Sequence, residues 1–533
     1  AGLFNCAFRS TKDLASKGGY LFAWIMDALM VGIGVGFDTL GAGTFTIKEP
    51  QYTGDTHIIA DSREGWVNSV QMLLDGFYKG AIIPNFDYSA IRELGAPILG
   101  FGGTSSGAGP LIELHKNLTA MYNDKVGEII TSVDIVDTEN LIGRCVVAGN
   151  VRRSAALAIG GSEDKEYLTM KNDQEKLMHH RWGSNNSFSA TVGMDYSWHA
   201  KQSQKNGEPG YIWLDNARTR GRFKDPPRDD DLNVMGFNPC VEQQLEDAEL
   251  CCLVETYPAK HETYEDYVKT LKIAYLYGKT VTLVNTHWPE TNAIMLKNRR
   301  IGLSMSGVIQ AFNKHSRREL LNWCDRAYDH VHDLDHQYSD WFCVPRSVRM
   351  TSIKPSGTVS LLNGSTPGIH YPEDEYYIRR IRFSKTSEFV DILRDAGYTV
   401  EDDVYSPNTA CVEFPVHEPF FVRGKRGVSM WEQLEIAAQF QHFWADNSVS
   451  VTVTFKPEEA DQIQTALEMY ETRLKAVSFL RYQETGYDQA PYEPITKEQF
   501  EEMSAKIEPI QRMDTQQGGV GEKFCDSDSC AIF

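Results

Sequence analysis

The stretch "VSVTVTF" at Val449–Phe455 alternates apolar and β-branched polar residues, a pattern typical of a β-strand. Pro457 then opens a segment in which apolar residues recur with helical spacing. Upstream, "YEDYVKTLKIAYLYGK" predicts a helix that ends at Gly278, and "TVTLVN" (280–285) predicts the next strand. Repeated exchange of strand and helix favours an α/β fold with parallel strands and crossover helices. The helical positions after Pro457 are Ile463, Ala466, Leu467, Tyr470 and Leu474.

Composition restricts the class of protein. The chain has 533 residues, of which 41% are hydrophobic and 24% charged, as in an ordinary globular protein with a large core. Its net charge of -20 argues against a protein that binds a nucleic-acid backbone. The most apolar run, Ala28–Phe37, is far shorter than the roughly 20 residues of a membrane-spanning helix. Ten cysteines without a secretory signal predict free thiols in a reducing cytoplasm.

The chain divides into one large unit and a tail. Residues 1–511 predict a catalytic α/β unit, and 512–533 predict a flexible C-terminal tail, because "GGVGEKFCDSDSC" lacks apolar periodicity. Two polar segments, 41–86 and 160–183, interrupt the strand–helix alternation and are expected to be insertions. His332 and His336 are spaced four apart without an evident third ligand, so no metal site is expected.

The motif "NPCVE" places Asn238, Cys240 and Glu242 at alternate positions, so an extended backbone would direct them to one side. Pro239 favours an exposed loop or finger over a central strand. An amide can hold hydroxyl groups, a carboxylate can exchange a proton, and a thiol can be a nucleophile, a redox group or a radical carrier. The alternatives are a small buried cysteine beside a solvated glutamate, or a zinc site, although the usual ligand spacing is missing.

Two further cysteines, Cys525 and Cys530, lie in the tail motif "CDSDSC". A flexible segment offers no core for them to fill, so they could instead carry reducing equivalents by thiol exchange. Two terminal thiols without a role remain the alternative.

Taken together, several motifs resemble the catalytic chains of ribonucleotide reductases, most closely the monomeric, adenosylcobalamin-dependent (class II) ribonucleoside-triphosphate reductases. The resemblance covers nearly the whole chain, and it implies a ten-stranded α/β barrel with Cys240 on a central finger loop. The motifs are "FNCAF" (4–8), "VGIGVGFDT" (31–39), "VAGNVRRSA" (147–155), "NPCVE" (238–242), "LCCLVE" (250–255), "RRIGLSMSG" (299–307), "KPSGTVSLLNGSTPGIHYP" (354–372), "DNSVSVTVTF" (446–455) and the tail.

The resemblance also implies the roles of the catalytic residues. Cys240 would carry a thiyl radical that removes the ribose 3′-hydrogen, Glu242 would exchange a proton with the 3′-hydroxyl, and Asn238 would hold the ribose hydroxyls. Cys6 and Cys251 would supply two electrons and form a disulfide, which requires their Cα atoms to approach to roughly 4.4–6.8 Å. The tail cysteines Cys525 and Cys530 would then pass the oxidation to thioredoxin or a similar dithiol.

Nucleotide contacts follow from the same resemblance. Ser356, Gly357 and Thr358 would bind the substrate phosphates at a helix N-terminus. The segments "IRELGAPILGFGGTSSG" (91–107) and "VAGNVRRSA" resemble loops that read a deoxynucleotide effector. The segment 41–86 resembles the insertion by which monomeric members imitate a partner subunit, so a monomer is expected. The candidate effector contacts are Arg92, Gly149, Asn150, Arg152 and Arg153.

Two departures and three alternatives accompany the resemblance. Cys252 is a spare thiol, and Asn5 stands before Cys6 where iron-dependent relatives commonly carry Ser. The resemblance implies an N-terminal helical region before "FNCAF" in full-length relatives, which is expected to lie outside this sequence. A class I ribonucleoside-diphosphate reductase large subunit would need a late Tyr-Tyr pair, but the only adjacent tyrosines are Tyr376 and Tyr377. A glycyl-radical relative lacks its glycine motif here, and a non-catalytic nucleotide sensor would not need every catalytic position filled. Adenosylcobalamin is therefore the expected cofactor and a ribonucleoside triphosphate the expected substrate.

Overall fold

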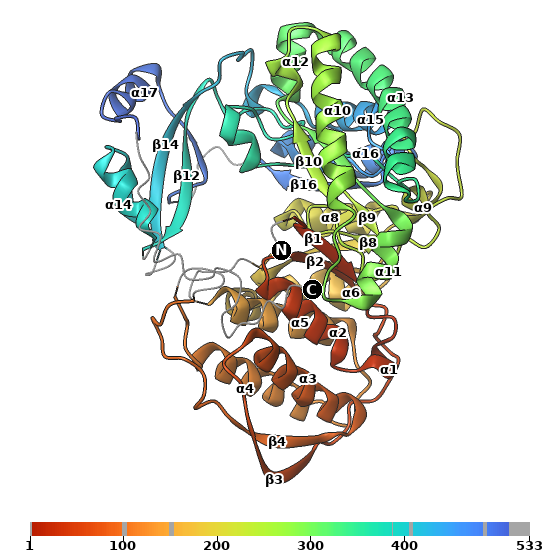
Figure 1. Cartoon of the computed structure of the whole chain (residues 1–533), viewed down its shortest axis with the longest axis vertical. Helices are drawn as coiled ribbons and strands as arrows, with labels where there is room; N and C mark the ends of the chain where they lie inside the picture. Colours follow the sequence, from red (N-terminus) through yellow and green to blue (C-terminus); the bar gives the residue numbers. More distant parts are fainter. Residues whose placement is uncertain are drawn as a thin grey trace.

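The computed structural model describes residues 3–98, 104–148, 154–385, 387–404, 409–482 and 488–510. Five parallel strands form the first half of a central barrel (Figure 1). Apolar residues alternate with glycine and small residues along them, so the strands are buried on both faces, as expected for parallel strands covered by helices. In spatial order they are β1 (Cys6–Arg9), β2 (Gly34–Asp38), β5 (Ala156–Gly161), β6 (Ser184–Ser189) and β7 (Gly210–Ile212).

A second group of five extended segments completes the barrel. β16 (Ala476–Arg481) pairs antiparallel with β7 and parallel with β15 (Thr452–Phe455). Parallel bridges then join Val449 to Ile353 and Thr351 to Leu303, which lies on β11. β11 (Gly302–Met305) pairs with β10 (Leu253–Thr256), and an antiparallel bridge from Leu250 to Ala7 returns to β1. The expected ten-stranded α/β barrel is confirmed.

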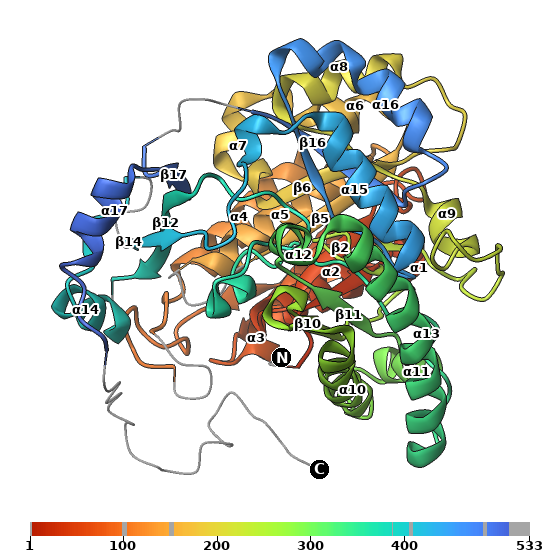
Figure 2. The ribbon, with the colours of Figure 1, turned by 90° about the horizontal axis from the view of Figure 1, so that it is seen from above.

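Helices surround the barrel on its outer side (Figure 2). Tertiary packing of their apolar faces, more than local propensity, stabilises such helices. They are α1 (Leu14–Lys17), α2 (Tyr20–Met30), α5 (Ser132–Val147), α6 (Lys165–Thr169), α7 (Gln174–His179), α8 (Ser197–Asn206), α9 (Leu214–Thr219), α10 (Tyr264–Val281), α11 (Pro289–Asn298), α12 (Val308–His315), α13 (Arg317–Phe342), α15 (Met430–Phe443) and α16 (Ile463–Tyr470).

The local predictions have mixed outcomes. The strand in "VSVTVTF" is present as β15, and a 3₁₀ turn followed by α16 begins at Pro457 as predicted. The predicted end of a helix at Gly278 and the strand 280–285 are wrong, because α10 continues to Val281. A Cβ atom at Gly278 would lie 3.1 Å from Val254 Cγ2, so this glycine permits close packing of the helix on the barrel.

A hairpin stands inside the barrel. β8 (Gly236–Phe237) pairs antiparallel with β9 (Gln244–Leu245), and its tip carries the "NPCVE" motif. Phe237 and Leu245 pack in an apolar cluster with the barrel residues Phe8 and Leu157. Gly36 on β2 makes this approach possible, since a Cβ atom there would lie only 1.8 Å from the Phe237 carbonyl oxygen. The predicted finger loop is therefore confirmed.

The predicted insertion forms a lobe at the bottom of Figure 1, and its long helix packs against α2. It contains the parallel pair β3 (Gln51–Ile58) and β4 (Ile82–Asp87), with α3 (Arg63–Lys79) between them and α4 (Gly109–Asn123) beside α3. The second expected insertion, 160–183, is instead the connection between the parallel strands β5 and β6, which must pass outside the sheet and contains short helices.

A four-stranded antiparallel sheet, which the sequence did not predict, projects at the upper left of Figure 1. Tyr376 and Tyr377 begin its strand β12. Among the described residues, every helix is too short or too polar to cross a membrane. The sheet has the order β13 (Thr399–Asp402), β14 (Thr409–His417), β12 (Tyr376–Ser384) and β17 (Tyr492–Pro494), with α14 (Glu388–Asp395) and α17 (Lys497–Ser504) packed against it.

Candidate active site

The finger tip is a tight turn that Asn238 stabilises. The Val241 amide donates to the Asn238 carbonyl at 2.9 Å, and the Gln243 amide donates to Asn238 Oδ1 at 3.0 Å. Val241 has a φ of 63°, an unusual left-handed conformation for a β-branched residue. A turn at the tip of the finger therefore brings Asn238, Cys240 and Glu242 to one place, in agreement with the expectation that Pro239 favours a loop or finger over a central strand. Asn238 Nδ2 is buried and has no hydrogen-bond partner among the described residues, so it can still donate to a ligand.

Three thiols meet at this tip. The Cys6 amide donates to Cys251 Sγ at 3.1 Å, and the Cys251 amide donates to the Cys6 carbonyl at 2.8 Å. The Cys6 thiol also contacts the Cys240 thiol. The first half and the second half of the barrel each contribute one cysteine of the predicted redox pair. The structure therefore brings together the two cysteines that stand 245 residues apart.

The thiols of Cys240 and Cys6 favour their protonated form. Contact with Cys6, burial and the nearby Glu242 charge raise the pKa of Cys240 well above its ordinary value. The contact with Cys240 would lower the pKa of Cys6, but contact with Cys251 and burial raise it more. A neutral S–H group can give a hydrogen atom, and the thiyl radical that it leaves can take one. This group is therefore arranged for hydrogen-atom transfer more than for attack by a thiolate.

Glu242 is a buried carboxyl group beside the thiols. Both of its carboxyl oxygens are buried and lack hydrogen-bond partners in the part of the chain that the structure describes. Burial raises the pKa of Glu242, while Lys354, whose Nζ lies 3.9 Å from Glu242 Oε1, opposes this rise. Burial alone would lower the pKa of Lys354, but the nearby charge of Glu242 raises it. Glu242 can therefore exchange a proton while Lys354 keeps its positive charge.

The predicted phosphate-binding residues follow Lys354 directly. Ser356 is 3% exposed, and its hydroxyl has no hydrogen-bond partner among the described residues. A Cβ atom at Gly357 would meet no atom within 4 Å, and Thr358 is exposed, so the loop borders open space. The expected helix is only a 3₁₀ turn, Val359–Asn363, so hydroxyl and backbone groups rather than an α-helix dipole would bind an anion here.

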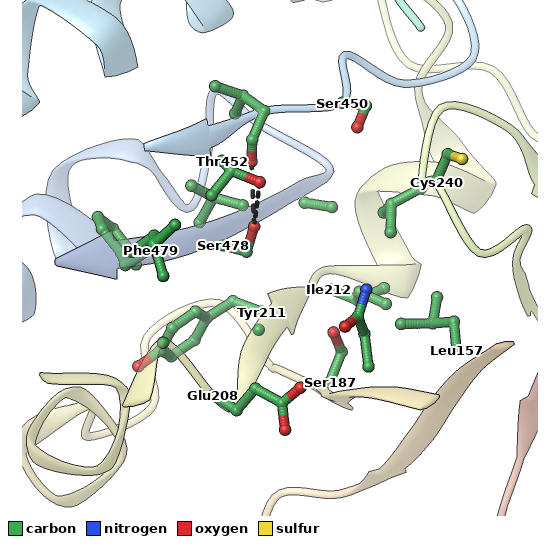
Figure 3. A pocket seen from close by; sticks show the side chains of 18 of the residues that line it. Leu157, Ser187, Glu208, Tyr211, Ile212, Cys240, Ser450, Thr452, Ser478 and Phe479 are labelled. Atoms are coloured by element: carbon green, nitrogen blue, oxygen red, sulfur yellow. Dashed lines mark hydrogen bonds between the residues drawn. The ribbon is translucent and has the colours of Figure 1, made fainter. Parts of the chain in front are cut away.

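A cavity of about 380 Å³ opens beside Cys240 (Figure 3). It lies between β5, β6 and β7 on one side and β15 and β16 on the other. Its wall combines aromatic and apolar side chains with hydroxyl, amide and carboxyl groups. The labelled lining residues are Leu157, Ser187, Glu208, Tyr211, Ile212, Cys240, Ser450, Thr452, Ser478 and Phe479.

Other residues with a predicted role do not lie with the thiols and Glu242 at the finger tip. Arg92 forms an ion pair with Asp61, with Nε and Oδ2 2.8 Å apart, in the inserted lobe. Cys252 lies next to Cys251 in sequence but donates to the Gly278 carbonyl at 3.4 Å, so its thiol is directed to α10. The predicted residues Gly149, Asn150, Arg152, Arg153, Cys525 and Cys530 lie outside the described residues.

His332 and His336 face a different polar cavity, of about 520 Å³, which Asp335 and Asp446 also line. Within the described ranges, no group of three or more His, Cys, Asp or Glu side chains has the arrangement of a metal site.

Sequence reasoning missed two charged residues of the site. Lys354 opens the motif "KPSGTVS" and Glu255 closes "LCCLVE", so both stood inside quoted motifs without being chosen. A lysine two residues before a predicted phosphate-binding serine was the available signal for Lys354. Nothing in the sequence indicated that Lys354 also faces Glu242, because that contact joins distant parts of the barrel.

Comparisons with known proteins identify the family of the chain. Residues 42–122 match the family model described as "B12-dependent ribonucleotide reductase, insertion domain". This match extends the predicted insertion beyond residue 86 and includes α4.

Curated relatives cover nearly the whole chain. The adenosylcobalamin-dependent ribonucleoside-triphosphate reductase of Euglena gracilis is 47% identical over 99% of this chain and 74% of its own length. A protein of Dictyostelium discoideum, described as a probable enzyme of the same name, is 46% identical over 100% of this chain and 74% of its own. A crystal structure of a B12-dependent (class II) ribonucleotide reductase superposes with a TM-score of 0.82 at 33% identity, covering 92% of this chain and 78% of that one. The chain belongs to the adenosylcobalamin-dependent, class II ribonucleoside-triphosphate reductases.

Proposed function

We propose that this chain reduces ribonucleoside triphosphates to 2′-deoxyribonucleoside triphosphates, with Cys240 as the carrier of a thiyl radical. The observation that carries the proposal is the meeting of three thiols and one buried carboxyl group at the finger tip. A plain structural cysteine would not need a second and a third thiol in contact with it. The orphaned Asn238 amide and Glu242 carboxyl group further indicate a ligand with several hydroxyl groups.

Each group of the site has a defined part in the reaction. The Cys240 radical takes the 3′-hydrogen atom of the ribose, and Glu242 accepts the 3′-hydroxyl proton. The 2′-hydroxyl leaves as water after protonation. Cys6 and Cys251 together supply two electrons and two protons, and a sulfur–sulfur bond forms between them. Cys240 finally returns the hydrogen atom to the 3′-carbon, so the net change is one ribonucleotide and one dithiol to one deoxyribonucleotide, one disulfide and water.

The electrostatics of the site suit this order of events. A carboxyl group whose pKa is raised by burial accepts a proton more readily than an ordinary carboxylate and can return it later in the cycle. Lys354 limits that rise and keeps one positive charge between the sugar site and the phosphate loop. Asn238 Nδ2 has a free donor for a ribose hydroxyl.

The cavity beside Cys240 fits a nucleoside part of adenosylcobalamin. Aromatic rings at Tyr211 and Phe479 can pack on a flat base, and Ser450, Thr452 and Glu208 can bind sugar hydroxyls. When bound, the cofactor supplies the one-electron oxidation that converts a thiol into a thiyl radical. A class I large subunit would need a late Tyr-Tyr pair, whereas the late strand β16 presents Ser478 and Phe479 to this cavity.

Further partners are proposed on the sequence motifs. A deoxynucleotide effector is proposed at the inserted lobe, where Arg92 lies, and at the segment containing Gly149, Asn150, Arg152 and Arg153. The inserted lobe supports a monomer, because it would replace the helices of a partner subunit. Thioredoxin or a similar dithiol is the proposed reductant of the tail cysteines Cys525 and Cys530.

The class of the enzyme is tested with the complete protein, a ribonucleoside triphosphate, a small dithiol and an effector mixture. Adenosylcobalamin or an iron-loaded radical subunit is then added, and deoxynucleotide is quantified by chromatography. The expected product forms only with adenosylcobalamin. Product only with the radical subunit would contradict the cofactor assignment while leaving thiyl chemistry in place.

A further inference from the structure

Two serines, Ser304 on β11 and Ser306 directly after this strand, hold both ends of the segment that contains the phosphate loop. Ser304 Oγ accepts a hydrogen bond from the Lys354 amide at 2.8 Å. Ser306 Oγ accepts one from the Gly368 amide at 3.0 Å. The segment 354–368 is thus fixed at its start and at its end by residues two positions apart, which lie on the same side of an extended backbone.

Ser306 depends in turn on Glu255. Its hydroxyl donates to Glu255 Oε1 at 2.5 Å. Glu255 lies on β10, directly opposite Ser304 of β11 in the parallel register. Two hydrogen bonds therefore link the Glu255 carboxylate on the barrel wall, through the Ser306 hydroxyl, to the Gly368 amide at the end of the phosphate loop.

The held segment has unused hydrogen-bonding groups. The hydroxyls of Ser365 and Thr366 are buried and have no hydrogen-bond partner in the described ranges, and the buried Ser356 hydroxyl lies near the Glu255 carboxyl group. Ser356 also has a φ of 46°, a left-handed conformation that costs free energy outside glycine. Buried polar groups without partners indicate a ligand, and on the proposed function this ligand is the substrate polyphosphate.

Glu255 is a carboxyl group where an anion is expected to bind. The charged or titratable groups that face it are Lys354, Tyr257 and Tyr267. Burial raises the pKa of Glu255 to about 7, although the nearby Ser306, Ser356 and Ser304 hydroxyls and the Lys354 charge oppose this rise. Near neutral pH the side chain is therefore close to half protonated. Additional negative charge beside Ser356 would favour the protonated form further.

We propose that Glu255 is a positioning residue for the substrate phosphates, which holds the phosphate loop through Ser306 and takes up one proton from solvent when the polyphosphate binds. This inference rests on the proposed function. Glu255 does not contact the thiols or Glu242, so its effect belongs to binding and not to the radical steps. The neutral acid accommodates the polyphosphate, whereas the carboxylate repels it, so KM should rise as pH increases through 7.

The direct test compares wild type with Glu255→Gln between pH 6.5 and 8.5. The γ-phosphate of the substrate titrates in the same range, so the informative quantity is the difference between the two profiles. Between pH 6.5 and 8.5, the KM of wild type for the triphosphate should rise roughly tenfold more than the KM of Glu255→Gln. The kcat values of the two proteins should be similar. Glu435→Gln, a carboxyl change next to Arg473 and away from the loop, is the matched control and should follow wild type. Parallel profiles for wild type and Glu255→Gln would overturn the inference.

Two further measurements separate positioning from a merely structural role. Ser306→Ala removes the hydroxyl link but keeps the carboxyl group, so it should raise KM at every pH and retain the wild-type pH slope. Calorimetry of wild type in two buffers of different ionisation enthalpy should show uptake of roughly half a proton or more on triphosphate binding at pH 7.5, and none with the unphosphorylated nucleoside. A wild type that binds and reduces the triphosphate without this uptake contradicts the inference alone. A wild type that forms no deoxynucleotide contradicts the proposed function itself.

Discussion

Contact, not burial, distinguishes the reactive thiols of this chain from the others. Cys251 and Cys252 are adjacent and equally buried. The Cys251 sulfur accepts from the Cys6 amide, whereas the Cys252 sulfur is directed to the Gly278 carbonyl on the other side of the strand. Burial raises the pKa of Cys252 to about 12, so it is an inert thiol that packs against α10.

This difference gives a matched pair of variants. Cys251→Ser should abolish multiple turnover, because no disulfide can form with Cys6. Cys252→Ser should keep most of the turnover, because a hydroxyl can still donate to the Gly278 carbonyl, and it should cost about 1 kcal/mol of stability at most. Steady-state rates and thermal unfolding of both variants check this. Equal loss of turnover in Cys252→Ser would assign that thiol a redox role.

Glu139 is a second residue whose burial has a measurable consequence. It lies on α5, is fully buried, and both carboxyl oxygens lack partners within the described residues. Burial raises the pKa of Glu139 to about 8. The unfolded state loses this proton near pH 4.5 and the folded state near pH 8, so the folded state becomes less stable across that window as pH rises.

We therefore expect Glu139→Gln to be more stable than wild type, by an amount that grows from pH 5 to pH 8 and then stays constant. The limit at high pH is about 5 kcal/mol, from about 1.4 kcal/mol for each unit of pKa between 4.5 and about 8. Denaturant unfolding of both proteins at pH 5.5, 7 and 8.5 measures the difference. A constant difference over this range would show that Glu139 is not protonated in the folded state.

At the scale of elements, the finger hairpin depends on one glycine of a barrel strand. Gly36 on β2 lies against the Phe237 carbonyl at the base of the finger. Gly161, at the end of the neighbouring strand β5, would meet no atom within 4 Å if it carried a Cβ. A Cβ atom would therefore clash at Gly36 but not at Gly161, although both glycines belong to the same sheet.

Gly36→Ala should move the finger and lower kcat about 100-fold, since a displacement of about 1 Å at a catalytic group has that effect. Gly161→Ala should retain wild-type kcat and the same unfolding temperature. Turnover and thermal unfolding of the pair check the prediction. If Gly36→Ala retained full activity, the position of the finger would not depend on this contact.

Local patterns predicted some elements and failed at others for physical reasons. "VSVTVTF" and the helix after Pro457 were predictable because their periodicity agrees with their burial. The helix α10 was cut short because Gly278 reads as a helix end, whereas its role is close packing against Val254. The antiparallel sheet around β12 and β14 was missed because no local signal separates such strands from barrel strands.

At the scale of the whole molecule, the site exists only because the barrel closes. Cys6 begins the barrel strand β1, Cys251 precedes β10, and Lys354 follows the bridged barrel segment 351–353. All three nevertheless meet at the finger tip. The family motifs predicted which cysteines and which finger residues would meet. They could not predict the contact of Lys354 with Glu242 or the cavity beside Cys240, because both arise from side chains on opposite halves of the barrel.

The tail adds a prediction at this scale. The Cys6–Cys251 pair is buried inside the barrel, so a protein reductant cannot reach it directly. Changing both Cys525 and Cys530 to Ser should abolish turnover with thioredoxin but retain it with a small dithiol that can enter the site. Rates with the two reductants, compared with wild type, test this. Equal loss with both would give the tail a structural role.

The central claim is that Cys240 carries the radical, and one variant tests it most directly. Cys240→Ser in the complete protein is supplied with ribonucleoside triphosphate, adenosylcobalamin and a small dithiol, and both deoxynucleotide formation and triphosphate affinity are measured. We expect no deoxynucleotide and an affinity close to that of wild type, because the phosphate loop at Ser356 is untouched. Deoxynucleotide formation by Cys240→Ser at a wild-type rate would contradict the account.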